Sequence, residues 1–234
     1  MLKTRIFNAF LPASCELCSA PSEHSLCDAC NDDLPRLHDI CTQCSLPLAS
    51  SGEKTERYCG QCLKHKPAFD KVVASFIYKD EVAWLINQFK HKNRLHFGRH
   101  LSRYLDRRIK MMYRSDTLPD LVTSVPLHWT RAFTRGFNQS ELLSRFLAVD
   151  VNRPYQNTMR KLTRTQKQQD LDRRARLNNL KQAFEVKADV NNKHIAVVDD
   201  VVTTGATAET LATLLKAAGA RRVDIWALAR TPKT

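Results

Sequence analysis

The sequence predicts an α/β protein in which a mostly parallel sheet flanked by helices follows a small cysteine-rich zinc-binding domain. Strand-like and helix-like segments alternate along residues 71–234, the order typical of a parallel sheet. All eight cysteines of the 234-residue chain precede residue 63 and form four C-x-x-C pairs. The formal net charge of +13 is divided as well, because residues 1–70 sum to −2 and residues 71–234 to +15.

The two parts of the chain are expected to be separate domains, residues 1–66 and 67–234, joined by the polar segment 64–67. A hydrophobic fraction of 43% and a charged fraction of 26% are typical of globular proteins and exclude wholesale disorder. No apolar run approaches the ~18 residues of a membrane-spanning helix. The apolar residues near the N-terminus are too few for a signal peptide. We therefore expect a cytoplasmic protein without membrane insertion.

Hydrophobic periodicity predicts the elements of the second domain. Short apolar runs indicate buried strands, whereas apolar residues at i, i+3, i+4 and i+7 indicate amphipathic helices. In chain order, we expect strands at 72–78, 121–126, 195–199 and 223–229, and helices around 82–89, 97–114, 139–148, 170–177 and up to residue 216. Gly219 is expected to end the last helix in a left-handed conformation.

The cysteines are expected to bind two structural zinc ions. The four pairs are Cys15/Cys18, Cys27/Cys30, Cys41/Cys44 and Cys59/Cys62. Two thiolates three residues apart reach one tetrahedral Zn²⁺ from a tight turn, and a second pair closes the shell without an open catalytic position. A disulfide framework would need a secretory context, and a redox dithiol would need one pair rather than four. The spacing leaves open whether the pairs combine sequentially or in an interleaved way.

The most specific motif of the second domain lies after the apolar strand that starts at Ile195. That strand delivers two carboxylates, Asp199 and Asp200, at the edge where α/β sheets bind ligands. The turn that follows consists of Thr203, Thr204, Gly205, Ala206 and Thr207. Backbone amides at a helix start and threonine hydroxyls both suit a phosphate group. A plain capped helix would explain the threonines, but not the acids and the glycine as well.

This pattern resembles the phosphoribosyl-pyrophosphate (PRPP) fingerprint of type I phosphoribosyltransferases, which implies a type I phosphoribosyltransferase-like fold. The resemblance implies that Asp199 and Asp200 act as the catalytic acids, holding the ribose hydroxyls. It further implies that residues 203–207 surround the 5-phosphate and that Mg²⁺ accompanies PRPP if the site is active. In that family a nitrogen nucleophile attacks the anomeric carbon while Mg-pyrophosphate leaves.

A second loop with a glycine follows the predicted strand 121–126. It contains Arg131, Arg135 and Gly136 ahead of a helix. Taken alone, this segment would be interpreted as a solvated loop. Because it follows an early strand in a chain that also carries the PRPP fingerprint, we expect it to be the pyrophosphate-binding loop, with the two arginines contacting pyrophosphate.

The sequence as a whole resembles the ComF family of competence-associated phosphoribosyltransferase-like proteins. The matching segments are the four C-x-x-C pairs and residues 85–90, 125–127, 135–139, 165–171, 176–184, 195–207 and 229–230. This resemblance implies DNA uptake or utilisation on the cytoplasmic side of the membrane, through binding of incoming single strands. It does not by itself imply transferase activity.

The positive charge is concentrated in residues 90–114 and 153–181, each with nine Lys and Arg. Arg99, Arg103 and Arg107 recur on one helix face, where same-sign neighbours repel unless an anion lies beside them. We expect this basic helix face to bind single-stranded DNA through phosphate contacts. A merely solvated charged face is the alternative interpretation.

Three functions compete. The first is a zinc-stabilised DNA-uptake protein that binds PRPP or a related phosphate and single-stranded DNA. The second is a base-salvage phosphoribosyltransferase, and the third is a non-catalytic adaptor whose zinc domain docks an uptake helicase. The charge of +15 outside the cysteine-rich segment exceeds what one PRPP needs and favours the first.

Overall fold

A central parallel sheet organises the part of the chain that the computed structural model describes, residues 14–50, 57–91, 94–127, 137–162 and 183–233. The strand order is β1-β6-β5-β2. The strands are β1 (Lys71–Ile77), β2 (Leu121–Ser124), β5 (His194–Val202) and β6 (Arg222–Arg230). Trp226 of β6 lies level with Val73 of β1 and Val198 of β5. The predicted parallel sheet is confirmed.

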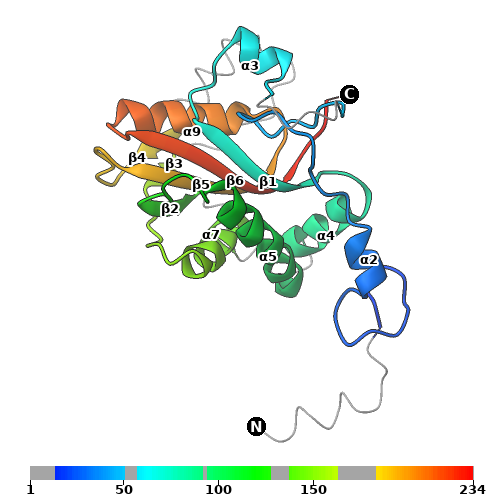
Figure 1. Ribbon diagram of the computed structural model, residues 1–234. Coiled ribbons are helices and arrows are strands. Elements are labelled where there is room, and N and C mark those ends of the chain that lie inside the picture. Colours follow the sequence, from blue (N-terminus) through cyan, green and yellow to red (C-terminus); the bar gives the residue numbers. More distant parts are fainter. Residues whose placement is uncertain (1–13, 51–56, 92–93, 128–136, 163–182, 234) are drawn as a thin grey trace, which may run out of the picture.

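Helices cover both faces of this sheet (Figure 1). The helices α4 (Asp80–His91), α5 (Leu95–Met112) and α7 (Gln139–Asp150) lie on one face, and α9 (Ala206–Ala217) lies on the other. The apolar stripes predicted for α4 and α5 are fully buried, from Val82 and Phe89 in α4 to Leu101 and Ile109 in α5. Gly219 follows α9 with a φ of 97°, which confirms the predicted left-handed cap. Within the described ranges, no helix is both long and apolar enough to cross a membrane.

Two features of the second domain differ from the sequence prediction. The strand β5 does not end at Asp199 but continues to Val202, because Val201 and Val202 still pair with β6. A short antiparallel ribbon of β3 (Met159–Lys161) and β4 (Phe184–Val186) was not predicted. Its Met159 is fully buried in the α9-side core, although the surrounding sequence is polar and basic. The helix predicted at 170–177 lies outside the described residues.

The cysteine-rich segment packs against the edge strand β1. The Ile77 amide donates to the Pro35 carbonyl at 2.8 Å, and the Leu37 amide donates to Ser75 at 2.9 Å. The Val72 amide donates to Gln43 at 2.8 Å. These bonds occupy an edge that would otherwise offer unpaired backbone groups to another chain.

The two halves of this segment lie on opposite faces of the sheet. Leu26 and Leu34 belong to the core beneath α4 and α5, whereas Leu37 and Leu46 belong to the core beneath α9. Just after the predicted linker, the Ala68 amide donates to Glu209 of α9 at 2.9 Å. The chain therefore already contacts the second domain at residue 68. The domain boundary at residue 66 stays a prediction.

A buried polar cluster lies at the amino ends of the strands, opposite the carboxyl ends. His194 Nε2 is 2.8 Å from Asp224 Oδ2, and the Tyr113 hydroxyl donates to the same oxygen at 2.5 Å. Trp226 Nε1 donates in turn to Tyr113 at 3.2 Å. Burial raises the pKa of Asp224, but the hydrogen bonds from His194 and Tyr113 outweigh this and hold that pKa below its usual value. This cluster stabilises a core around a charge that would be costly to leave unpaired.

Candidate zinc centres and phosphate site

The eight cysteines gather into two clusters of four, and the pairs combine sequentially. In each cluster all four sulfur atoms lie within 4.8 Å of one another. The clusters are Cys15, Cys18, Cys27 and Cys30, and Cys41, Cys44, Cys59 and Cys62. The pairing that the spacing left open is thus settled, and we call these two units the first and the second ribbon.

The two ribbons are built alike. In each, a C-x-x-C turn ends in a serine with positive φ, Ser19 at 62° and Ser45 at 53°. The amide of each serine donates to the carbonyl of the first cysteine of its ribbon, at 2.8 and 2.9 Å. The third cysteine of each ribbon is the N-cap of a short helix, Cys27 for α2 (Asp28–Asp32) and Cys59 for α3 (Gly60–Lys64). The turn and the helix start present two thiols each to a common point.

The geometry of both clusters fits zinc. Cys18 Sγ lies 3.7 Å from Cys27 Sγ, and Cys44 Sγ lies 3.6 Å from Cys59 Sγ. A disulfide needs about 2.05 Å. Four sulfurs at about 2.3 Å around one tetrahedral Zn²⁺ lie about 3.8 Å apart, close to the separations observed. All eight cysteines are free thiols, so each ribbon offers a complete four-sulfur shell for a structural ion.

Asp199 and Asp200 lie near the carboxyl end of β5, and their side chains have different partners. Asp199 Oδ1 accepts from the Ser140 hydroxyl at 3.0 Å and from the Asp200 amide at 2.9 Å. Asp200 Oδ2 lies 2.8 Å from Lys90 Nζ, at the end of α4. The acid pair is therefore held between α4 and the start of α7.

The pKa of Asp199 reflects this crowding. Burial and the adjacent Asp200 carboxylate raise the pKa of Asp199 to about 7, against the opposing influence of the Asp200 amide, Lys90 and Ser140. A carboxyl group with such a pKa is readily ionised by an approaching cation or hydroxyl donor. Both acids offer the oxygen ligands that Mg²⁺ prefers.

The loop between β5 and α9 leaves its backbone donors free. Gly205 is the N-cap of α9 and has a φ of 83°, a conformation that is strained for other residues. It has no side chain that could accept a hydrogen bond from the first turn of the helix. Among the described residues, the amides of Thr203, Thr204 and Gly205 donate to no other group. The side chains of Thr203 and Thr204 are exposed. Free amides at a helix start form a natural anion site.

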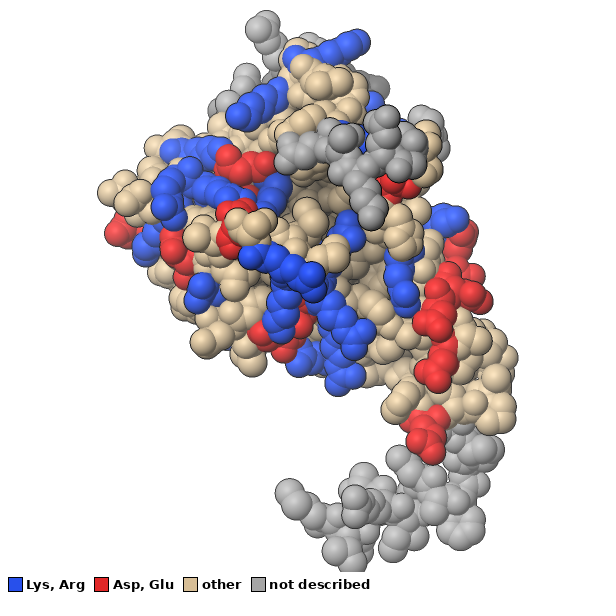
Figure 2. All heavy atoms as spheres, viewed as in Figure 1, with Lys and Arg blue, Asp and Glu red and all other residues tan. Residues whose placement is uncertain are grey.

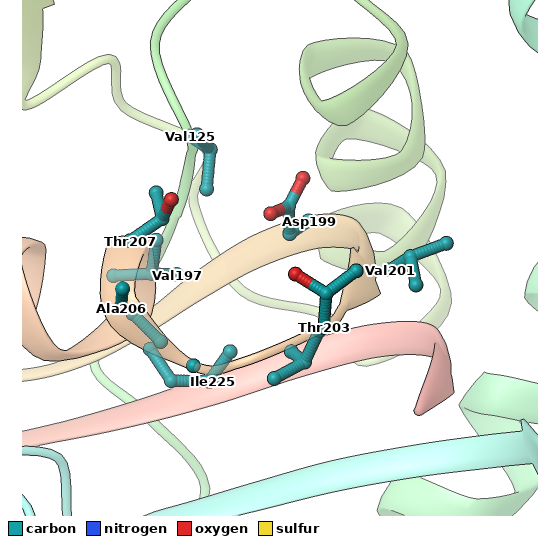
Figure 3. A pocket seen from close by; sticks show the side chains of 11 residues that line it. Val125, Val197, Asp199, Val201, Thr203, Ala206, Thr207 and Ile225 are labelled. Carbon is teal, nitrogen blue, oxygen red and sulfur yellow. The ribbon is translucent and has the colours of Figure 1, made fainter. Parts of the chain in front are cut away.

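A small open pocket lies beside this loop. Figure 3 shows Asp199, Thr203 and Thr207 around it, with Val125 from the end of β2 on the far side. Ala206 and Gly205 also line it. The structure therefore brings Asp199 and four residues of the predicted phosphate loop to one cavity, whereas Thr204 and Asp200 do not line it.

The segment before α7 closes the site from the β2 side. The Asn138 side chain caps α7 by accepting from the Ser140 amide at 3.1 Å and donates to the Val125 carbonyl at 3.2 Å. The Gln139 side chain donates to the Lys90 carbonyl at 3.2 Å. The predicted pyrophosphate-loop residues Arg131, Arg135 and Gly136 lie outside the described residues.

Three residues of the site were not assigned a role from sequence: Lys90, Ser140 and Arg230. Arg230, the last residue of β6, is buried and donates to the carbonyl of Val202 at 3.0 Å. Lys90 and Arg230 fall in segments that resemble the ComF family, and this resemblance is the signal in the sequence that could have pointed to them. Their partners lie far away in the sequence, so no local pattern revealed them.

The predicted DNA-binding arginines lie along α5. Arg103 and Arg107 are exposed, and no carboxylate among the described residues pairs with them. Arg99, however, donates to both carboxylate oxygens of Asp150, at 2.7 and 3.0 Å. Arg99 therefore already has an acidic partner, and Lys110 pairs with Asp106 one turn earlier in α5. Whether these arginines bind DNA stays a prediction. Figure 2 shows Lys and Arg gathered over α5 and acidic side chains along the first ribbon.

Comparison with known domains defines the class of protein. Residues 6–63 match the double zinc ribbon domain, and residues 140–234 match the phosphoribosyl transferase domain. The purine phosphoribosyltransferase of Pyrococcus horikoshii aligns with a TM-score of 0.38 and 15% identity, over 58% of this chain and 84% of that structure. The two domain matches show that the chain is a phosphoribosyltransferase-like protein with an N-terminal double zinc ribbon.

Full-length relatives define the family. The chain is 36% identical to DNA utilization protein YhgH of Salmonella typhimurium over 227 residues, covering 94% of this chain and 98% of the relative. YhgH of Escherichia coli K12 is 35% identical over the same shares. Competence protein F of Haemophilus influenzae is 32% identical over 215 residues, covering 89% of this chain and 92% of the relative. The chain belongs to this ComF family of competence and DNA-utilisation proteins.

Proposed function

We propose that the protein is a cytoplasmic DNA-utilisation protein that binds PRPP or a related phosphate at the β5–α9 loop and single-stranded DNA along α5. The observation that carries the first part is the loop itself. Free amides at Thr203, Thr204 and Gly205 lie next to a pocket that Asp199 lines. The amides suit a phosphate group, and the Asp199 carboxylate suits the hydroxyls of the same ligand, within one small volume.

Each group has a distinct role in this proposal. The amides and hydroxyls of residues 203–207 hold the phosphate, and Asp199 and Asp200 accept hydrogen bonds from ribose hydroxyls. Mg²⁺ arrives with the pyrophosphate, whose charge it neutralises. Lys90 balances Asp200 in the free protein.

Calorimetry with Mg-PRPP tests the phosphate site. Wild-type protein should bind, and Thr203→Ala/Thr204→Ala should bind about tenfold more weakly through the loss of two hydroxyl donors. Thr213→Ala is the matched control, because that threonine bonds only within α9, to the Glu209 carbonyl. The same samples assayed for base-dependent pyrophosphate release distinguish a binding protein from a transferase. Absence of binding to Mg-PRPP, pyrophosphate and inorganic phosphate alike would refute this site.

The DNA surface rests on the unpaired cations of α5. Arg103 and Arg107 are exposed and lie one turn apart on one face of α5, with about 6 Å of rise between them. Arg114 is also exposed and lies just beyond the end of the helix. Cations without acidic partners are free to neutralise phosphates, whereas Arg99 is already engaged by Asp150. A docked helicase or other uptake protein stays a prediction.

Salt dependence tests the DNA surface. Binding of a short single strand should weaken with salt, and Arg103→Gln/Arg107→Gln should lower the slope of log affinity against log salt by about 1.4, for two lost phosphate contacts. Arg145→Gln is the control, since Arg145 on α7 is already paired with Glu141. An unchanged slope in the double variant would exclude α5 as the contact surface.

The cytoplasmic setting is supported by the cysteines. All eight are free thiols grouped for metal binding. Such thiolate clusters persist in reducing compartments, whereas oxidising ones convert cysteines to disulfides.

A further inference from the structure

Arg230 joins the second ribbon to the phosphate loop. Its Nε donates to the carbonyl of Cys44, a member of the second cysteine cluster, at 3.0 Å. Its Nη1 donates to the carbonyls of Val202 and Thr203, where β5 passes into the loop. One guanidinium thus fixes two segments that are far apart in the chain.

No carboxylate in the part of the chain that the structure describes pairs with Arg230. The residue is 6% exposed, and among the described residues all its hydrogen bonds go to backbone carbonyls. A buried cation satisfied by neutral acceptors alone keeps a net positive field around it. That field lies directly behind the loop to which we assign an anion.

The same contacts set the direction of the loop amides. In a trans peptide, the carbonyl and the next N–H point in opposite directions. Because the carbonyls of Val202 and Thr203 point to Arg230, the amides of Thr203 and Thr204 point away from it. Those are two of the amides left free beside the pocket.

We infer that Arg230 is a positioning residue through which the zinc-bound second ribbon holds the phosphate loop in its anion-binding conformation. This inference rests on the proposed phosphate function. With four cysteines of the second ribbon gathered around zinc, the Cys44 carbonyl is a fixed anchor for Arg230. Loss of that ion releases the anchor and, with it, the orientation of the loop amides. Within the described ranges, no hydrogen bond links the first ribbon to this loop, and the first ribbon packs on the opposite face of the sheet.

Amide hydrogen exchange tests the coupling without any ligand. Wild type, Arg230→Met, Cys62→Ser and the double variant are compared, with zinc content and circular dichroism recorded for each. Arg230→Met should keep two zinc ions while exchange rises at least tenfold at the amides of Glu209 and Thr231, and the core of β5 should stay protected. These two amides donate to the carbonyls of Gly205 and Val202, at the two ends of the loop. Cys62→Ser should give a similar rise, and the double variant no more than the larger single effect. Cys30→Ser, in the first ribbon, should leave exchange at both amides unchanged.

Affinity gives the second readout. Arg230→Met should weaken binding of Mg-PRPP about tenfold or more, and Arg230→Lys should recover only part, because an ammonium cannot reproduce the fork of donors. Wild-type exchange at Glu209 and Thr231 in Arg230→Met, or additive effects with Cys62→Ser, would overturn the coupling. Absence of binding by wild type would instead refute the phosphate site, and the exchange result would still decide the coupling.

Discussion

The two ribbons share one local design but have different surroundings. In the first, Cys18 is exposed, and Cys27 and Cys30 are half-buried. Its polar link to α5 runs through Glu16, which pairs with Arg94 and lies 2.9 Å from His96. In the second ribbon, Cys41, Cys44 and Cys59 are buried in the α9-side core.

This difference separates what the cysteines determine from what tertiary contacts determine. Four thiols at C-x-x-C spacing are enough to fold either ribbon around its ion. Among the described residues, the second ribbon alone adds a backbone bond to β1, from the Val72 amide to Gln43, and the Arg230 contact to the phosphate loop. We therefore expect the second ribbon to support the whole domain and the first to act as a peripheral unit.

Removing one ligand from each ribbon should produce the largest contrast. Cys59→Ser and Cys27→Ser are matched, because each residue is the third ligand and the N-cap of a short helix. Each variant should lose one of two zinc ions. Because zinc binding contributes folding free energy, Cys59→Ser should lower the free energy of unfolding by about 3–5 kcal/mol, and Cys27→Ser by roughly 1–2 kcal/mol less.

Metal analysis and denaturant unfolding measure both effects. Cys18→Ser, at the exposed first-ribbon ligand, is a further control and should resemble Cys27→Ser. Equal destabilisation by Cys59→Ser and Cys27→Ser would contradict the ranking of the two ribbons.

The free energy of unfolding should depend on pH through Asp199, which lies beside the phosphate loop. The pKa of Asp199 is raised to about 7 in the folded protein by burial and by Asp200, against about 3.9 when unfolded. The folded protein therefore holds this proton more tightly than the unfolded chain does. The resulting contribution to the free energy of unfolding is fully present below about pH 4 and is lost as the pH rises through about 7. Asp199→Asn, which cannot ionise, should be more stable than wild type at pH 8 by on the order of 1–3 kcal/mol.

The difference between Asp199→Asn and wild type should vanish near pH 4, where the aspartate is protonated. Urea unfolding at pH 4.5, 6, 7 and 8 measures it. Ser140→Ala is the companion variant, because it removes one donor to Asp199 and should move the wild-type transition to higher pH. A stability difference that does not change with pH would show that Asp199 has an ordinary pKa.

Local patterns in the sequence predicted most of the fold and part of the site. The spacing of the cysteines was sufficient for two four-sulfur clusters, and the acids and threonines around Gly205 predicted residues that line the pocket, whose phosphate ligand stays a proposal. The sequence did not show which C-x-x-C pairs combine, because the sequential and the interleaved combination both satisfy tetrahedral zinc. The pairing is resolved by backbone bonds between the two C-x-x-C pairs of each ribbon, from the Glu16 amide to Ser25 at 2.9 Å and from the Thr42 amide to Arg57 at 2.8 Å.

What the sequence missed depends on contacts between distant segments. Arg230 bonds to Cys44 across 186 positions, and no periodicity encodes a bond to a carbonyl. Lys90 meets Asp200 only because α4 ends beside β5. The basic face of α5 was read from one helix alone, so the pairing of Arg99 with Asp150 on α7 could not be anticipated.

The smallest expected effect concerns the serines that follow the two C-x-x-C turns. The Ser45 hydroxyl is fully buried and donates to the Val72 carbonyl of β1 at 2.6 Å, whereas Ser19 is exposed and its hydroxyl makes no hydrogen bond within the described residues. Both have positive φ, so an alanine meets the same backbone cost at either position. Ser45→Ala should therefore cost about 1–2 kcal/mol, and Ser19→Ala should stay within about 0.5 kcal/mol of wild type. Equal unfolding free energies for the two variants, measured in urea with zinc content unchanged, would mean that the attachment of the second ribbon to β1 adds nothing to the stability of the fold.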